Sequence, residues 1–253
     1  ADSNDEGETY GTANNSTLFL GATNTLYANR ICVSGSASGN LANVISGRIL
    51  FQTGITDGRL TIRGVSGGSS RADLIIGSHG GDESASTARS TAGYVDITGG
   101  IVDAMIGLLA IAEGRGGWVG GSGSGGMSGS LTMNGGVIDA TNVVVGRTMN
   151  KSTTNTNTSP TTGTLSISNG LLRTGALAMS LNDGGAGQIV RSTLTIAGTG
   201  IVAVTGDVIL GRKNGITTNI EVTVNIAGGA MTVGGNMAPG SASPEIISDV
   251  SIN

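Results

Sequence analysis

The feature that most constrains this chain is a short apolar–polar–apolar triplet that recurs along it. The triplet reads Leu60-Thr61-Ile62, Val95-Asp96-Ile97, Leu131-Thr132-Met133, Leu165-Ser166-Ile167, Leu194-Thr195-Ile196 and Val224-Asn225-Ile226. Successive copies begin about 29 to 36 residues apart. Self-similarity at a period of about 20–50 residues is typical of solenoids, propellers and repeat arrays. The chain is therefore expected to consist of similar units stacked on one another.

A second apolar stretch follows most of these triplets and ends in a small residue. It reads Ile31-Cys32-Val33-Ser34, Leu74-Ile75-Ile76-Gly77, Leu109-Ala110-Ile111-Ala112, Val143-Val144-Val145-Gly146, Leu177-Ala178-Met179-Ser180 and Val208-Ile209-Leu210-Gly211. The final Gly, Ala or Ser indicates a tight corner that a larger side chain would obstruct. Turn residues such as Gly99-Gly100 and Asn169-Gly170 follow the first triplet, and Gly and Asn tolerate the positive φ that corners need. The period-two alternation predicts strands between these corners.

Two or three short strands cannot bury an apolar face by themselves, but stacked repeats can pair each strand with its equivalent in the next coil. We therefore predict an all-β fold, a single-stranded right-handed parallel β-helix (β-solenoid) of about six to seven coils, because parallel crossovers are overwhelmingly right-handed. We expect an N-terminal arm at 1–17, the solenoid at 18–237 and a C-terminal strand or tail at 238–253. The region 36–58 fits the pattern least well, and Ile49-Leu50-Phe51 is either an extra strand or a degenerate coil.

Composition excludes several classes of protein. The 253 residues include 46 Gly without a collagen period, and 38% are hydrophobic, which is too many for low-complexity disorder. Lys and Arg total 13 against 17 Asp and Glu, so no nucleic-acid partner is expected. No apolar stretch is long enough for a membrane helix, and one Cys with one His does not make a zinc centre. We expect no cofactor and no metal.

The pattern Gly-x-Leu-x-Ile-x-Gly-Gly-x-Val-x-Ala, followed by Leu-x-Ile-Gly, is clearest at 129–147 and 192–212. It resembles the glycine-rich β-strand repeats of secreted bacterial surface proteins, including autotransporter passengers and large exported proteins with PEP-CTERM sorting tails. The resemblance covers roughly residues 58–234. It implies a parallel β-helix that serves as a stalk, an adhesin or a matrix component. The chain opens at Ala1 rather than Met, which also suits a mature, exported form.

The two ends of a solenoid are open strand edges that favour further pairing. No amphipathic capping helix is evident in 1–17 or 238–253. Near the C-terminus, Ile246, Val250 and Ile252 share one face of a short alternating segment. This segment either folds back as a cap or adds to a neighbouring subunit.

A catalytic alternative rests on Asp103, Asp139 and Arg173. If adjacent coils align their repeats, the two aspartates lie about 5 Å apart, a separation that suits a retaining glycosidase, with Arg173 in the next coil. A solvated charge ladder explains the same pattern more simply. No aromatic residue recurs at a position predicted to stack a sugar.

Two further patterns concern the surface. The middle residues of the first triplets form a predicted outward row, Thr61, Asp96, Thr132, Ser166, Thr195 and Asn225. This row is compatible with an ice-binding face, but hydrogen bonding along the stack explains it more simply. Glycosylation sequons begin at Asn14, Asn15, Asn150 and Asn157.

The sequence thus favours a non-catalytic extracellular structural subunit that assembles with copies of itself into a filament or surface layer. A carbohydrate-active β-helix (a polysaccharide lyase or hydrolase) and a glycan-binding adhesin are the alternatives.

Overall fold

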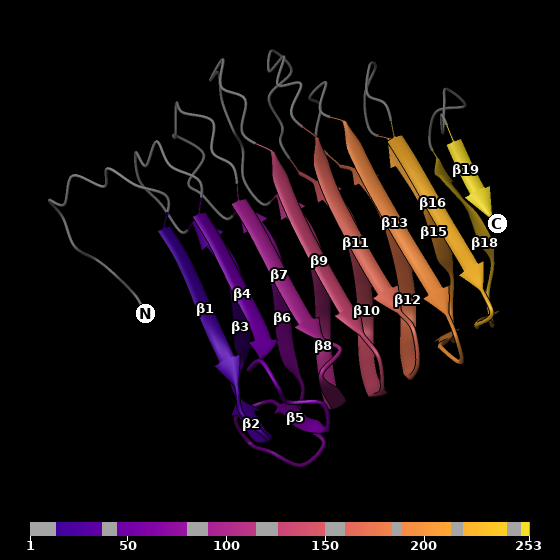
Figure 1. Ribbon diagram of the computed structural model, residues 1–253. Coiled ribbons are helices and arrows are strands. Elements are labelled where there is room, and N and C mark those ends of the chain that lie inside the picture. The colour runs from indigo at the N-terminus through magenta and orange to yellow at the C-terminus, as the bar shows by residue number, and fades with distance from the viewer. Residues whose placement is uncertain are drawn as a thin grey trace, which may run out of the picture.

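The computed structural model describes residues 14–36, 45–79, 91–114, 126–149, 160–183, 189–213, 220–241 and 249–252. Every regular element in these ranges is a β-strand. Within this part of the chain there is accordingly no helix that could cross a membrane. The strands lie side by side in chain order from the N-terminal to the C-terminal end (Figure 1).

One sheet, called sheet A here, has eight strands, and every neighbouring pair is parallel. In order, its strands are β1 (Asn14–Leu20), β4 (Ile45–Phe51), β7 (Thr91–Ile97), β9 (Met127–Met133), β11 (Thr161–Ile167), β13 (Val190–Ala197), β16 (Ile220–Ala227) and β19 (Asp249–Ile252). Along β9 the side chains alternate between buried and half-buried positions. Sheet A therefore has one face toward the core and one toward solvent, as the period-two pattern predicts.

The second sheet, sheet B, has eleven strands arranged on two faces that share three long strands. The shared strands are β8 (Gly100–Gly114), β10 (Gly136–Thr148) and β12 (Leu171–Asn182). Face B1 adds β2 (Thr23–Tyr27), β5 (Gly58–Arg63), β14 (Ile201–Val204) and β17 (Ala230–Val233) to their first halves. Face B2 adds β3 (Arg30–Ser36), β6 (Ala72–His79), β15 (Val208–Lys213) and β18 (Met237–Ser241) to their second halves.

The two faces of sheet B meet where the long strands change their alternation. In β8, every second residue from Gly100 to Ile106 is buried. After Gly107 this alternation ends, and Leu109 and Ile111 are also buried. The pairing register is also interrupted at Thr141, between the Ala140 and Asn142 pairs. A coil therefore has three sides, which are sheet A, face B1 and face B2.

Aliphatic columns fill the interior, because each coil places similar residues at the same position. Leu131, Leu165 and Leu194 follow one another in register in sheet A and are fully buried. On face B2, Leu109, Val143 and Leu177 do the same. The predicted parallel β-solenoid is confirmed. Seven successive coils contribute strands to both sheets and β19 adds a further rung to sheet A, which agrees with the predicted six to seven coils.

The small residue that ends the second apolar stretch adopts the left-handed backbone conformation in each of the first six coils. These residues are Ser34, Gly77, Ala112, Gly146, Ser180 and Gly211, with φ between 50° and 78°. Opposite this corner, sheet A carries the in-register glycines Gly47, Gly93, Gly129 and Gly163. A Cβ at Gly129 would lie 2.6 Å from the Ala112 nitrogen and 2.6 Å from the Ile76 oxygen. Sheet A and face B2 therefore approach one another at this corner because sheet A lacks side chains there.

One part of the predicted repeat alignment is wrong. Leu60-Thr61-Ile62 lies in β5 on face B1, where it pairs with Val102-Asp103-Ala104. The sheet A position of this coil belongs instead to Ile49, which pairs with Val95. Alternation identifies a half-buried strand but not its sheet. In this coil, coil 2 counted from the N-terminus, residues 52–57 separate β4 from β5, and the triplet belongs to the face B1 strand that follows the sheet A strand.

Strand pairing extends past the expected solenoid bounds of 18 and 237. β1 pairs with β4 from Asn14 onward, and β18 pairs with β15 as far as Ser241. In β19, Val250 pairs with Val222 and Ile252 with Val224 of the same chain. The C-terminal strand thus continues its own sheet as a further rung, while Ile246 lies outside the described residues.

Candidate functional site

The two aspartates of the catalytic alternative are not cross-strand neighbours, in contrast to the prediction. Asp103 pairs with Val137, whereas Asp139 pairs with Met105. The register between β8 and β10 is offset by two residues because the corner from β9 to β10 is two residues shorter than the corner from β7 to β8. Gly136 follows Met133 by three positions, whereas its partner Val102 follows Ile97 by five. The Cα atoms of the two aspartates are therefore about 8 Å apart, one strand spacing across and two residues along. The direct pair expected for a retaining mechanism, about 5–5.5 Å between carboxyl groups, is not formed.

Each carboxylate instead forms an ion pair with an arginine from another coil. Arg63 Nη2 lies 2.6 Å from Asp103 Oδ2, and its Nη1 donates to the Asp103 backbone oxygen at 2.7 Å. Arg71 Nη2 lies 2.7 Å from Asp139 Oδ1, and its Nη1 donates to the backbone oxygens of Asp139 and Ile106. Arg71 thereby connects coil 2 to coil 4 across coil 3.

Arg173 lies opposite Asp139, as predicted, because β10 and β12 pair these two residues. Asp139, however, directs Oδ1 to Arg71. Asp103, Asp139 and Arg173 thus belong to a charge ladder on the outside of face B1. Within the described residues, the two carboxylates of this ladder form ion pairs that connect different coils.

A second charge ladder, which sequence reasoning missed, follows face B2 near its last residues. Glu113 is fully buried, and its Oε1 lies 3.3 Å from Arg147 Nη1. Arg147 Nε donates to Asp183 at 2.8 Å, and Arg212 donates to the same carboxylate at 2.8 Å from Nε. Four charged groups of alternating sign thus connect four successive coils. The signal in the sequence is one charged residue one to three positions after four of the small corner residues, Ala112, Gly146, Ser180 and Gly211.

The sequons that the structure describes lie on β1 rather than in a loop. Asn15 is exposed, and its Oδ1 accepts a hydrogen bond from Ser46 Oγ on β4. Asn14 begins the same strand. Asn150 and Asn157 lie outside the described residues. Nor do the described residues contain three His, Cys, Asp or Glu side chains grouped so that they could hold a metal ion.

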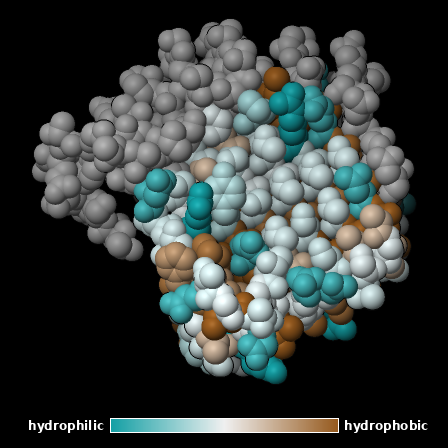
Figure 2. Space-filling view, viewed as in Figure 1, coloured by the Kyte–Doolittle hydropathy of each residue, from teal (hydrophilic) through white to brown (hydrophobic). Residues whose placement is uncertain are grey.

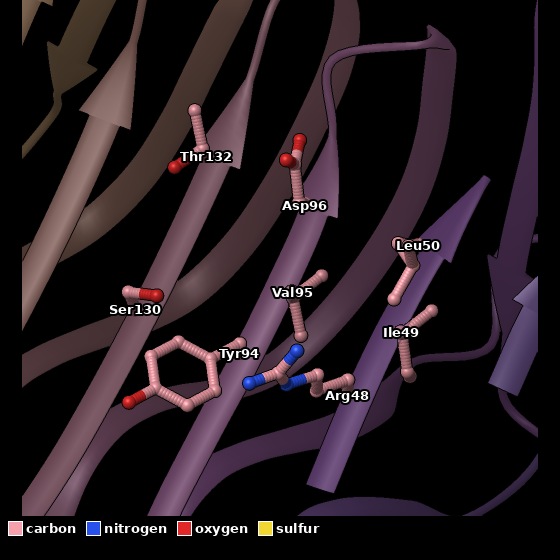
Figure 3. Close-up of a pocket in the computed structure, with 8 residues that line it drawn as sticks. All are labelled: Arg48, Ile49, Leu50, Tyr94, Val95, Asp96, Ser130 and Thr132. Carbon is pink, nitrogen blue, oxygen red and sulfur yellow. The ribbon is translucent and has the colours of Figure 1, made fainter. Parts of the chain in front are cut away.

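The outer face of sheet A carries a hollow that we call the Tyr94 hollow. It is lined by Ile49 and Val95 and by six further residues on β4, β7 and β9: Arg48, Leu50, Tyr94, Asp96, Ser130 and Thr132. These six side chains form a grid, because Arg48, Tyr94 and Ser130 are in register across β4, β7 and β9, and Leu50, Asp96 and Thr132 are in register two residues further along. Figure 3 shows the Tyr94 ring and the Arg48 guanidinium next to each other, with Asp96 and Thr132 further along their strands.

Contacts within the hollow hold two of its polar groups in place. The Arg48 guanidinium carbon lies 5.4 Å from the centre of the Tyr94 ring, a cation–π contact. Asp96 Oδ1 accepts hydrogen bonds from the Thr98 nitrogen at 3.0 Å and from Thr98 Oγ1 at 2.7 Å. Tyr94 remains 40% exposed. The hollow therefore offers an aromatic ring, a cation and an anion to solvent.

Beyond the hollow, the same two rows continue with hydroxyl-bearing side chains, and one row ends in the amide of Asn225. Ser130 is followed by Thr164, Thr193 and Thr223, while Thr132 is followed by Ser166, Thr195 and Asn225. This part of the molecule is pale and free of large apolar areas in Figure 2. Of the predicted outward row, Thr61 alone is misplaced, because it belongs to face B1.

Comparison with known proteins gave no match to a family model, to a curated protein or to a solved structure.

Proposed function

We propose that this protein is a non-catalytic structural subunit that assembles end to end, through copies of itself, into an extracellular filament or surface layer. The main support is the exposure of core-type side chains at both ends of the described stack. The extracellular location rests on the resemblance of the repeat to those of secreted surface proteins.

At the N-terminal end, the first coil leaves part of the aliphatic columns uncovered. Leu18 is 45% exposed, whereas its register partner Ile49 is 6% exposed. Leu26 is partly buried, whereas its partner Ile62 is buried. The core-facing Leu18 is thus largely exposed at this end, while Leu20 of the same strand remains buried.

The C-terminal end shows the same change. Met231 and Val233 of β17 are only partly buried, while their partners Val202 and Val204 of β14 are almost completely buried. Among the described residues no helix covers either end. Both ends therefore combine apolar side chains with strand edges that have no described partner.

The first and the last complete coils have the same three sides, so the two ends have similar cross-sections apart from β19, which extends sheet A by one rung at the C-terminal end. When the C-terminal end of one copy meets the N-terminal end of another, β19 of the first and β1 of the second lie edge to edge in sheet A, and the apolar ends of the two columns face one another. Such a head-to-tail contact does not close on itself, so it generates a filament.

The test uses two variants that each block one end with a charge, Leu18→Lys and Val233→Lys. We expect the wild type to form rods that lengthen with protein concentration in negative-stain electron microscopy. Each variant alone is expected to stay monomeric in sedimentation velocity, and their mixture is expected to form dimers and stop there, because each dimer has one free end of each blocked kind. Circular dichroism would verify that both variants fold.

A matched control is Thr195→Lys, which places the same charge on the side of the column. This variant should assemble as the wild type does. Wild-type protein that stays monomeric at all concentrations, or folded end variants that still elongate, would contradict the proposal.

A further inference from the structure

The Tyr94 hollow takes no part in the end-to-end contact, because it lies on the side of the column over β4, β7 and β9 (Figure 3). It also lies outside both charge ladders, which are on faces B1 and B2. Its floor is rigid, since Ile49 and Val95 between the other lining residues are buried in the core. The hollow is therefore a preformed surface feature, and neither end-to-end assembly nor inter-coil ion pairing accounts for its aromatic and charged side chains.

The size of the grid limits the ligand. Three neighbouring strands span about 10 Å, and residues two apart on a strand are about 7 Å apart. The hollow is open to solvent along sheet A, where the hydroxyl rows begin. This footprint suits a single six-membered ring that belongs to a longer chain, rather than a large flat cofactor.

Its groups fit a polyhydroxylated ligand with one apolar side. Tyr94 and Leu50 supply an apolar platform, while Arg48 supplies N–H donors that the ring contact holds in position. Asp96 supplies carboxylate acceptors, positioned through Thr98. A few placed polar groups on an apolar floor are typical of small-ligand sites, and charged groups make the strongest hydrogen bonds to hydroxyls.

The presence of both charges favours a neutral ligand. Asp96 and Arg48 are diagonal neighbours on adjacent strands, because Arg48 is in register with Tyr94 and Asp96 lies two residues further along the same strand. A carboxylated sugar that approached Arg48 would also meet the negative charge of Asp96. Hydroxyl groups, which both donate and accept, can satisfy the two side chains together.

We propose that the Tyr94 hollow binds one pyranose residue of a neutral glycan chain, stacked on Tyr94 and hydrogen-bonded by Arg48 and Asp96. Neighbouring sugar residues lie over the hydroxyl rows that begin at Thr164 and Ser166. This site gives the column a glycan-binding side, independent of whether the ends assemble.

The experiment measures binding by isothermal titration calorimetry with cellohexaose, chitohexaose and mannohexaose. We expect at least one of them to bind the Leu18→Lys parent protein with a millimolar or lower Kd, and its disaccharide to bind more weakly. Tyr94→Ala should weaken binding at least ten-fold, and Asp96→Asn and Arg48→Gln should each weaken it several-fold. All measurements use Leu18→Lys protein as the parent, so that assembly does not affect the result.

Matched controls come from sheet B. Tyr27→Ala removes another exposed tyrosine, and Arg59→Gln another exposed arginine, both on face B1; neither should change the affinity. Lack of binding of all three hexasaccharides at millimolar concentration overturns the proposal, as does binding that Tyr94→Ala leaves unchanged. Preferential binding of polygalacturonate that Asp96→Asn strengthens overturns the neutral assignment. If Tyr94→Ala, made in the wild type, abolishes self-association in sedimentation velocity and no glycan binds, the proposal is overturned and the hollow is assigned to a second copy of the chain.

Discussion

Ala112 and Gly129 approach so closely that the first keeps a left-handed backbone and the second has no room for a side chain. The φ of Ala112 is 56°, and a Cβ on Gly129 would lie 2.6 Å from the Ala112 nitrogen. The same relationship recurs between Gly146 and Gly163, where the corresponding distance is 2.7 Å. The corner between face B2 and sheet A therefore depends on small residues on both sides.

Gly129→Ala should destabilise the fold strongly. The new Cβ would clash with backbone atoms of Ala112 and Ile76, which cannot move without displacing their strands. We expect a loss of about 1–3 kcal/mol or more in the free energy of unfolding, measured with urea. Gly21→Ala is the matched control, because no atom lies within 4 Å of a Cβ there, and it should change stability little.

Substitutions of Ala112 should separate backbone strain from packing. Ala112→Gly removes a left-handed cost of roughly 1–2 kcal/mol but adds about 0.5–1 kcal/mol of chain entropy, so the net change should stay within about 1 kcal/mol. Ala112→Val should cost at least about 2 kcal/mol, since a β-branched side chain is poorly tolerated at positive φ and would be overpacked in this buried corner. Similar stabilities of the two variants in thermal unfolding would contradict this account.

The charge ladder of face B2 should be more sensitive at its centre than at its end. Arg147→Met removes the cation that contacts both buried Glu113 and Asp183. We expect a loss near the lower end of about 3–5 kcal/mol, because Arg147 is itself partly exposed. Arg212→Met, at the more exposed end of the ladder, leaves Asp183 paired with Arg147 and should cost less than about 1 kcal/mol. Equal losses in urea unfolding would show that the ladder does not act as described.

Asp139 and Arg71 should be coupled in a double-mutant cycle. Both side chains are about one third exposed, so we expect a coupling free energy of about 0.2–1 kcal/mol for Asp139→Asn with Arg71→Gln. The pairing of Asp103→Asn with Arg71→Gln should be additive, because Asp103 contacts Arg63 instead. If Asp103 and Asp139 were coupled to each other more strongly than to their arginines, the predicted adjacent pair would have to be reconsidered.

Buried Ser192 should be required for stability. In the sixth coil it occupies the sheet A position that Gly163 occupies in the coil before it. Its Oγ accepts a hydrogen bond from the buried Ser180 nitrogen at 2.9 Å. Ser192→Ala leaves that nitrogen without this acceptor, so unfolding free energy should fall by about 1–3 kcal/mol. Thr193→Ala, on the outer face of the same strand, is the control and should have a small effect.

The sequence by itself determined the parallel β-solenoid. Alternating triplets fix strands, and the small residues at Ser34, Gly77 and Ala112 fix corners, because both depend on local backbone and side-chain properties. It also determined that β10 and β12 bring Asp139 opposite Arg173, since these coils have corners of equal length.

The tertiary structure alone decided which strands share a sheet and which side chains meet. Ile49 rather than Leu60 belongs to sheet A, since the alternating pattern is the same in every strand and does not tell which sheet a strand joins. Asp103 is not opposite Asp139, because the register depends on how many residues each corner takes up. The Tyr94 hollow was missed for the same reason: Arg48 and Tyr94 are 46 positions apart in the sequence, and only the pairing of β4 with β7 places one against the other.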